Sequence, residues 1–160
     1  MPSFKKDYEF GIKKEEELCG AMSEDAGIKL QKIEKVYSAL DFVSEDGSRF
    51  AELKSRKCEK DAFPDTIVGM DKVQVAKELV ELGKEVDFYF NFTDGLYKYP
   101  YSEEMFKWAA PFKRHQRTDF NDKEKLYCYI PTDELVEVKK HKSKPNVLRA
   151  KVQRTNWKNI

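Results

Sequence analysis

The sequence predicts a mixed α/β domain, in which a four- or five-stranded sheet is flanked by two helices and followed by additional C-terminal strands. Apolar residues recur with the period of a helix in residues 7–22 and again in residues 71–82. Residues 85–92 alternate in the manner of a central strand and are rich in aromatic side chains. A chain of 160 residues that is 40% hydrophobic is long enough to bury one core.

The first predicted helix carries one glutamate on its apolar face. At about 100° per residue, the apolar residues within 7–22 lie in a single stripe along the helix. Glu15 falls in the middle of this stripe, whereas Glu16 and Glu17 turn toward solvent. A carboxylate on a buried face needs a compensating charge. Glu15 is therefore a candidate functional residue, with the alternative that it simply reaches water. The apolar members of the stripe are Tyr8, Gly11, Ile12, Leu18, Cys19 and Met22.

A β-hairpin follows the helix. Residues 36–43 and 49–54 are apolar and β-prone, and Asp46 and Gly47 between them are favoured in a two-residue loop in which both residues have positive φ. This register places Asp41 directly opposite Glu52. Directly opposed side chains lie roughly 4.5–5.5 Å apart, and two like charges there are destabilising unless a cation lies between them.

The hairpin therefore predicts a site for a divalent cation. Asp41 has apolar neighbours on both sides, as expected inside a strand, and Glu52 is followed two residues later by Lys54 on the same face. An isolated carboxylate in apolar surroundings costs several kcal/mol unless it is paired or bound to a metal. The alternative is a solvent-facing strand edge with ordinary charges.

The rest of the chain alternates between short helices and strands. A loop at 55–66 leads to the helix at 71–82, and the strand at 85–92 returns through a turn as a hairpin. A short helix between 102 and 110 precedes strands at 126–130 and from 136 onward.

The order of helix glutamate, strand aspartate, Glu-x-Lys strand and helix resembles the PD-(D/E)XK nuclease superfamily, which has the restriction-endonuclease-like fold. Residues 11–15 (Gly-Ile-Lys-Lys-Glu) are similar to the Gly-x-x-x-Glu of several branches, including Holliday-junction resolvases. The resemblance covers roughly residues 8–92. Leu40 stands where the superfamily often has proline.

The resemblance implies a metal-dependent endonuclease that cleaves nucleic acid, with DNA favoured over RNA as the substrate, Mg²⁺ as cofactor and Mn²⁺ as a substitute. Asp41 and Glu52 would be the primary metal ligands and the Leu53 carbonyl a third. Glu15 would bind a second ion or orient a ligand water. Lys54 would position the attacking water or stabilise the anionic transition state. These residue types suit Mg²⁺ chemistry, which needs oxygen ligands and few carboxylates.

Several basic residues are candidates for binding nucleic acid. In the superfamily, the helix after the hairpin often lends a Lys or Gln to the site, which makes Lys72 the first choice and Gln74 the second. An aromatic and basic run at 112–117 could contact the nucleic-acid backbone or could protect a strand edge by its charge. The remaining candidates are Arg56, Lys113, Arg114, Arg117, Lys140 and Arg149.

The charge is distributed unevenly along the chain. Residues 139–160 contain eight Lys or Arg and no acid, which leaves −7 on residues 1–138. We expect residues 1–138 to form the nuclease-like domain and 139–160 to be a basic segment of the same domain. The segment would follow phosphates or, alternatively, only aid solubility. A non-catalytic nucleic-acid-binding module of the same fold and a purely structural ion-pair network remain alternatives.

Composition argues against several other classes. The three cysteines are widely spaced without a Cys-x-x-Cys, which disfavours zinc sites and disulfides, and neither His115 nor His141 belongs to a ligand pattern. No apolar run is long enough to span a membrane, and the first residues lack the apolar core of a signal peptide. We therefore expect an intracellular protein, cytoplasmic or in the nucleoid or nucleus, without a membrane partner. Whether it forms a homodimer stays open.

Overall fold

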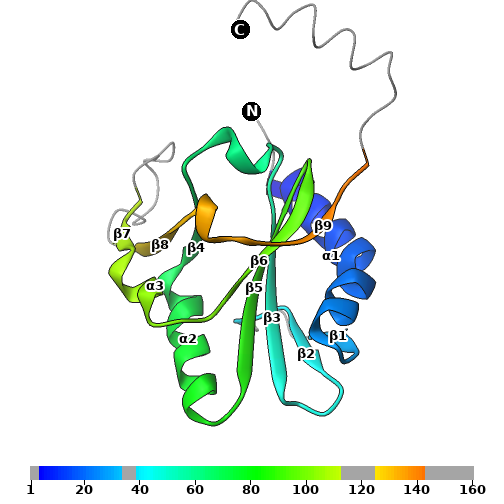
Figure 1. Ribbon diagram of the computed structural model, residues 1–160, viewed down its shortest axis with the longest axis vertical. Helices are drawn as coiled ribbons and strands as arrows, with labels where there is room; N and C mark the ends of the chain where they lie inside the picture. The colour runs from blue at the N-terminus through cyan, green and yellow to red at the C-terminus, as the bar shows by residue number, and fades with distance from the viewer. Residues whose placement is uncertain (1–3, 34–38, 113–124, 143–160) are drawn as a thin grey trace, which may run out of the picture.

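The computed structural model describes residues 4–33, 39–112 and 125–142. Figure 1 shows a central sheet with one long helix on each side. In chain order the elements are α1 (Phe4–Ala26), β1 (Leu30–Lys32), β2 (Phe42–Ser44), β3 (Arg49–Ser55), η1 (Lys60–Ala62), β4 (Asp65–Gly69), α2 (Met70–Glu81), β5 (Glu85–Phe92), β6 (Gly95–Pro100), α3 (Glu104–Lys107), β7 (Ala109–Pro111), β8 (Leu126–Pro131), η3 (Thr132–Glu134) and β9 (Val136–Lys140).

The strands form two sheets. A six-stranded sheet has the order β1-β2-β3-β5-β6-β9, and a three-stranded sheet has the order β4-β8-β7. Strands β3 and β5 are parallel, and the other pairs are antiparallel. The predicted mixed α/β class with flanking helices and added C-terminal strands is confirmed. The sheet is larger than the predicted four or five strands, and β1, β4 and β7 were not predicted. Strands β1 and β7 have three residues each, too few to show alternation, and β4 begins inside the predicted loop at 55–66.

Two apolar clusters fill the space on either side of the central sheet. On the α1 side, Ala51 and Leu53 of β3 pack with side chains of the helix. On the α2 side, Phe88 and Phe90 of β5 pack with that helix and with the smaller sheet. Successive side chains of a strand point to opposite faces. Glu52, between Ala51 and Leu53, is therefore directed to the α2 face.

The hairpin of β2 and β3 has the predicted register where its strands pair. Phe42 lies opposite Ala51, and Val43 lies opposite Phe50. The regular pairing ends there. The N–H of Asp41 donates at 3.1 Å to the carbonyl of Ala51, which is already the partner of Phe42. The strands therefore separate one residue before the predicted backbone pair of the two carboxylates.

The hairpin turn differs from the predicted two-residue loop. Gly47 has a φ of 76°, but Asp46 keeps a negative φ, so only one of the two residues is left-handed. The N–H of Gly47 donates to the carbonyl of Ser44 at 2.9 Å, and residues 45–48 form a four-residue loop. Asp46 Oδ1 accepts hydrogen bonds from the hydroxyls of Ser44 and Ser48, each at 2.7 Å. Since the longer loop is centred on the same point, it leaves the register unchanged.

Both long helices were predicted, with different ends. Helix α1 extends beyond the predicted residues 7–22 at each end. Tyr8, expected in the buried stripe, is 60% exposed, while Leu18 and Met22 are buried as expected. Helix α2 begins one residue earlier than predicted and leaves Leu82 exposed at its C-terminal end. Within the described ranges, none of the helices is long and apolar enough to cross a membrane.

Candidate active site

A groove of about 1210 Å³ opens where β2 and β3 separate, between α1 and α2. Its walls include all four residues predicted to be catalytic, which come from helix α1, from the residue just before β2 and from strand β3. The structure thus brings together side chains separated by up to 57 positions in the chain. The predicted site residues in this groove are Glu15, Asp41, Glu52, Leu53, Lys54, Arg56 and Lys72.

Glu52 is the most buried of these carboxylates. The residue is 1% exposed, and its Oε1 atom has no hydrogen-bond partner among the described residues. Its Oε2 atom lies 3.5 Å from the amines of both Lys54 and Lys72. Burial, and then the negative charge of Asp41, raise the pKa of Glu52 to about 7, although the two lysines act in the opposite direction. Glu52 therefore lacks full compensation for its charge.

Asp41 is held beside Glu52 by the backbone of β3. Its Oδ2 atom accepts a hydrogen bond from the N–H of Leu53 at 3.0 Å, so the carboxylate pairs with β3 just past the point where the backbone ladder has ended. Its Oδ1 atom is 4.0 Å from the amine of Lys32. Because β2 and β3 separate here, the side chain of Asp41 lies in the wall of the groove.

Glu15 reaches the same groove from α1. Its side chain is 13% exposed and forms an ion pair of 2.6 Å with Lys32 of β1, whereas Glu16 and Glu17 face solvent as predicted. Burial raises the pKa of Glu15, and the nearby charge of Asp41 adds to this, while Lys32 lowers it. Glu16 also lines the groove, but the helical period selected the glutamate that is partly buried there and pairs with Lys32.

Lys32 was missed by the sequence analysis. It stands between Glu15 and Asp41, and these carboxylates raise its pKa despite partial burial. Strand β1 has three residues and therefore shows no periodicity of its own. The only available signal was indirect, because a carboxylate on a buried helix face requires a cation from elsewhere in the chain.

The structure brings Lys72, and not Gln74, to the groove. The Lys72 amine donates a hydrogen bond to the carbonyl of Ala39 at 2.6 Å and lies 3.5 Å from Glu52. Gln74 is exposed on α2 and bonds to Glu78 on the same helix. Lys72 thus joins the start of α2 to the chain just before Asp41.

The other predicted nucleic-acid contacts lie in different places. The guanidinium of Arg56 donates to the carbonyl of Ile67 and to the hydroxyl of Thr66, and the residue lines the groove. Lys140 is exposed on the edge strand β9, 4.0 Å from Glu137, and does not line the groove. Lys113, Arg114, Arg117 and Arg149 lie outside the described residues.

The candidate ligand atoms are oxygens, the type of ligand that Mg²⁺ prefers. Asp41 and Glu52 offer carboxylate oxygens, and Mg²⁺ is usually held by one or two carboxylates and several waters. The unpartnered Oε1 of Glu52 is a buried oxygen that a cation would satisfy. In the described part of the chain, however, no three His, Cys, Asp or Glu residues are grouped closely enough to hold a metal ion. Glu15 is engaged by Lys32, so the geometry fits a site of two carboxylates.

Comparisons with known proteins identify the family of this chain. The model of a family described as "phage putative PDDEXK endonuclease" matches residues 4–138. The structure is similar to that of Hjc, a Holliday junction resolvase from the archaeal hyperthermophile Archaeoglobus fulgidus, with a TM-score of 0.46 and 15% sequence identity over 82% of this chain and 95% of that chain. No curated protein matches. Since the family match spans most of the chain and confirms the predicted resemblance, this protein belongs to the phage putative PDDEXK endonuclease family.

Proposed function

We propose that this member of an endonuclease family hydrolyses phosphodiester bonds of nucleic acid, DNA in preference to RNA, with the help of Mg²⁺. The groove between α1 and α2 would be the active site, with Asp41, Glu52, Lys54 and Glu15 as its catalytic residues. Mn²⁺ would substitute for Mg²⁺, because both ions accept oxygen ligands.

One observation carries this proposal. Glu52 is almost fully buried beside Asp41, and one of its oxygens has no partner among the described residues. Leaving a buried carboxylate incompletely paired next to a like charge costs free energy. A cation between the two carboxylates removes that cost. A chain under selection for folding alone has no use for such a pair.

Each residue of the groove would have its own role in the reaction. Asp41 and Glu52 would hold the cation together with the carbonyl of Leu53. When bound, Mg²⁺ supplies a water acidic enough to act as nucleophile and offsets the charge that develops on the phosphoryl oxygens. Lys54, whose amine is 3.5 Å from Glu52, would orient the attacking water or donate a hydrogen bond to a phosphoryl oxygen. Glu15 would hold a further water once Lys32 turns away from it.

The lysines of the groove favour a second candidate function. Lys32 pairs with Glu15 at 2.6 Å, and Lys54 and Lys72 flank Glu52, so the groove is partly compensated without any metal. A non-catalytic module of the same fold would use this groove to bind nucleic acid without cleaving it. If no nucleic acid binds either, the groups form only a structural ion-pair network.

Calorimetry with Mn²⁺ separates these functions. We expect the full chain to bind Mn²⁺ and to cleave members of a mixed panel of DNA and RNA, DNA faster, and we expect Glu52→Ala to lose both properties. The control is Glu17→Ala, which removes a carboxylate from the exposed face of α1. Nucleic-acid binding that is independent of Mn²⁺, without cleavage, would instead support the module.

A further inference from the structure

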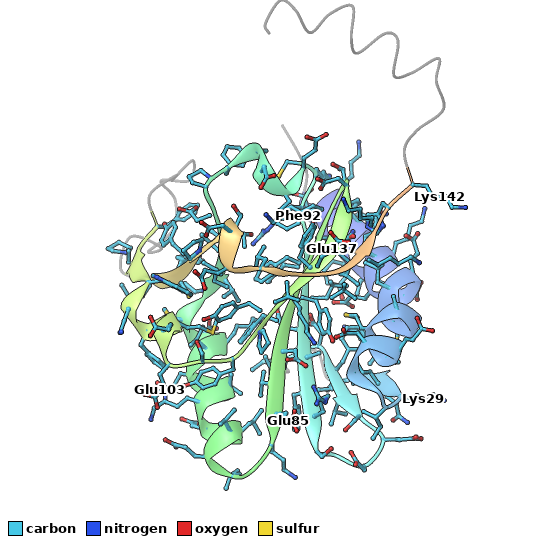
Figure 2. All side chains as sticks on the ribbon, viewed as in Figure 1. Lys29, Glu85, Phe92, Glu103, Glu137 and Lys142 are labelled. Atoms are coloured by element: carbon cyan, nitrogen blue, oxygen red, sulfur yellow. The ribbon has the colours of Figure 1, made fainter. Side chains whose placement is uncertain are left out.

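A second cavity adjoins the catalytic groove and has no role in the function proposed above. Its volume is about 360 Å³, and Arg56 and Lys57 line both hollows. It lies where the parallel strands β3 and β5 end. Phe92, part of its lining, is at the opposite end of β5 from Glu85 (Figure 2). Open α/β sheets commonly bind ligands beyond the carboxyl ends of their parallel strands.

Aromatic rings line this cavity. Phe92 is buried and is held edge-on against Tyr97, with ring centroids 6.0 Å apart. Phe112 rests against Tyr127, with centroids 5.2 Å apart. Phe63, in the loop between η1 and β4, lines the same cavity but is 47% exposed. Part of the Phe63 ring is thus accessible to solvent at the cavity.

Charges of both signs line the cavity, and Lys60 is among the cations. Arg56 and Lys57, on the wall shared with the catalytic groove, are cations suited to a phosphate. Glu59 and Asp65 also line the cavity and would repel a phosphate there, but their carboxylates can accept hydrogen bonds from the amino groups of a base. This arrangement suits a nucleotide whose phosphate lies toward the groove and whose base lies among the phenylalanines.

We propose that this cavity binds one unpaired nucleobase of the substrate, which stacks on Phe63. Aromatic side chains beside a basic groove are the usual means of holding unpaired bases, because every base has a face that can stack. The volume lies near the lower end of the roughly 300–1,000 Å³ found for small-molecule pockets, which suits a single nucleoside. A base that is stacked within a duplex cannot enter such a pocket without leaving the helix.

The proposal rests on the proposed function and narrows its substrate class. With the base in the cavity and its phosphate at Arg56 and Lys57, the neighbouring phosphate lies at the catalytic groove. The preferred substrate is therefore nucleic acid with an unpaired nucleotide next to the scissile phosphate, and not a fully paired duplex.

A binding assay with 2-aminopurine tests this assignment. One probe is a DNA duplex in which a single 2-aminopurine nucleotide is unpaired, and the other is the same duplex with that nucleotide paired. Both are titrated with the full chain in EDTA, so that binding is measured without cleavage. We expect the unpaired probe to bind about tenfold more tightly. We also expect its fluorescence to be quenched as the base stacks on the ring.

Three variants test whether the preference for the unpaired probe depends on the ring of Phe63. Phe63→Ala should lose the quenching and the preference while still binding the paired duplex, and Phe63→Tyr, which keeps a ring, should retain both. Leu82→Ala, which removes an exposed apolar side chain at the far end of α2, should behave as the wild type. Equal thermal unfolding of the variants verifies that they are folded.

An undiminished preference in Phe63→Ala, or equal affinity of the wild type for the two probes, would overturn the assignment. Because the assay contains no divalent ion, its outcome does not depend on whether the chain cleaves. Cleavage is measured separately in Mn²⁺, so a failure of the proposed nuclease activity is seen independently of the base-binding result.

Discussion

Replacing Glu52 with glutamine should stabilise the metal-free protein, and the gain should depend on pH. The side chain is almost fully buried, and its pKa is raised from 4.5 to about 7 by burial and by Asp41. The folded state therefore binds the proton of Glu52 more tightly than the unfolded state does. Wild-type stability falls as pH rises from about 4.5 to about 7, and the whole penalty is present above that pH.

The size of the effect follows from the same pKa. Each pKa unit corresponds to about 1.4 kcal/mol, so the rise to about 7 corresponds to about 3 kcal/mol. Glutamine has a similar shape and no charge to bury. In EDTA at pH 8, we expect Glu52→Gln to unfold with a free energy about 3 kcal/mol larger than that of the wild type. This equals a rise in Tm of about 6–12 °C for a chain of this length. At pH 4.5 the difference should be close to zero.

Urea unfolding followed by circular dichroism, repeated between pH 4.5 and pH 8 in EDTA, measures this difference. The matched control is Glu24→Gln, on the exposed side of α1, which should change stability equally at all pH values. A difference between wild type and Glu52→Gln that does not vary with pH would refute the reasoning. So would a wild type that is the more stable of the two at pH 8.

Three further predictions test other parts of the groove and its scaffold. Lys72→Ala should slow single-turnover cleavage at least about tenfold, because its amine reaches the groove, whereas Gln74→Ala on the exposed face of α2 should cleave at the wild-type rate. Lys32→Ala should lower the free energy of unfolding at pH 8 by about 1 kcal/mol in urea titrations. The substitution leaves the partly buried Glu15 without its cation. The expected loss is small, because the amine of Lys32 is partly exposed and solvent screens its attraction to Glu15. Gly47→Ala should cost about 1 kcal/mol in the same titrations, because its φ of 76° strains a residue with a Cβ although no atom lies within 4 Å of the added group.

The main elements of the fold could be predicted because their information is local. The 3.6-residue period of α1 distinguished Glu15 from its two neighbouring glutamates, and the structure places Glu15 in the groove. The hairpin register was also predicted correctly, even though the turn was assigned the wrong type. The register depends on where the turn is centred, and Gly47 marks that point whether the loop has two residues or four.

The contacts that complete the groove could not be predicted in this way. Asp41 leaves the backbone ladder one residue early and bonds through its carboxylate to Leu53, a detail of pairing that strand propensity does not contain. Lys32 meets Glu15 only because β1 lies beside α1, and a three-residue strand carries no period.

The sequence by itself determined the class of the fold, the carboxylates and lysine of the proposed site, and the register of the hairpin as far as the pair of Phe42 and Ala51. Helical and strand periods are set by backbone geometry and can be read from neighbouring residues. The tertiary structure alone decided that Lys32 compensates Glu15 and how Phe63 comes to line a cavity beside the groove. Those contacts join segments far apart in the chain, and they exist only once the two helices have packed on the sheet.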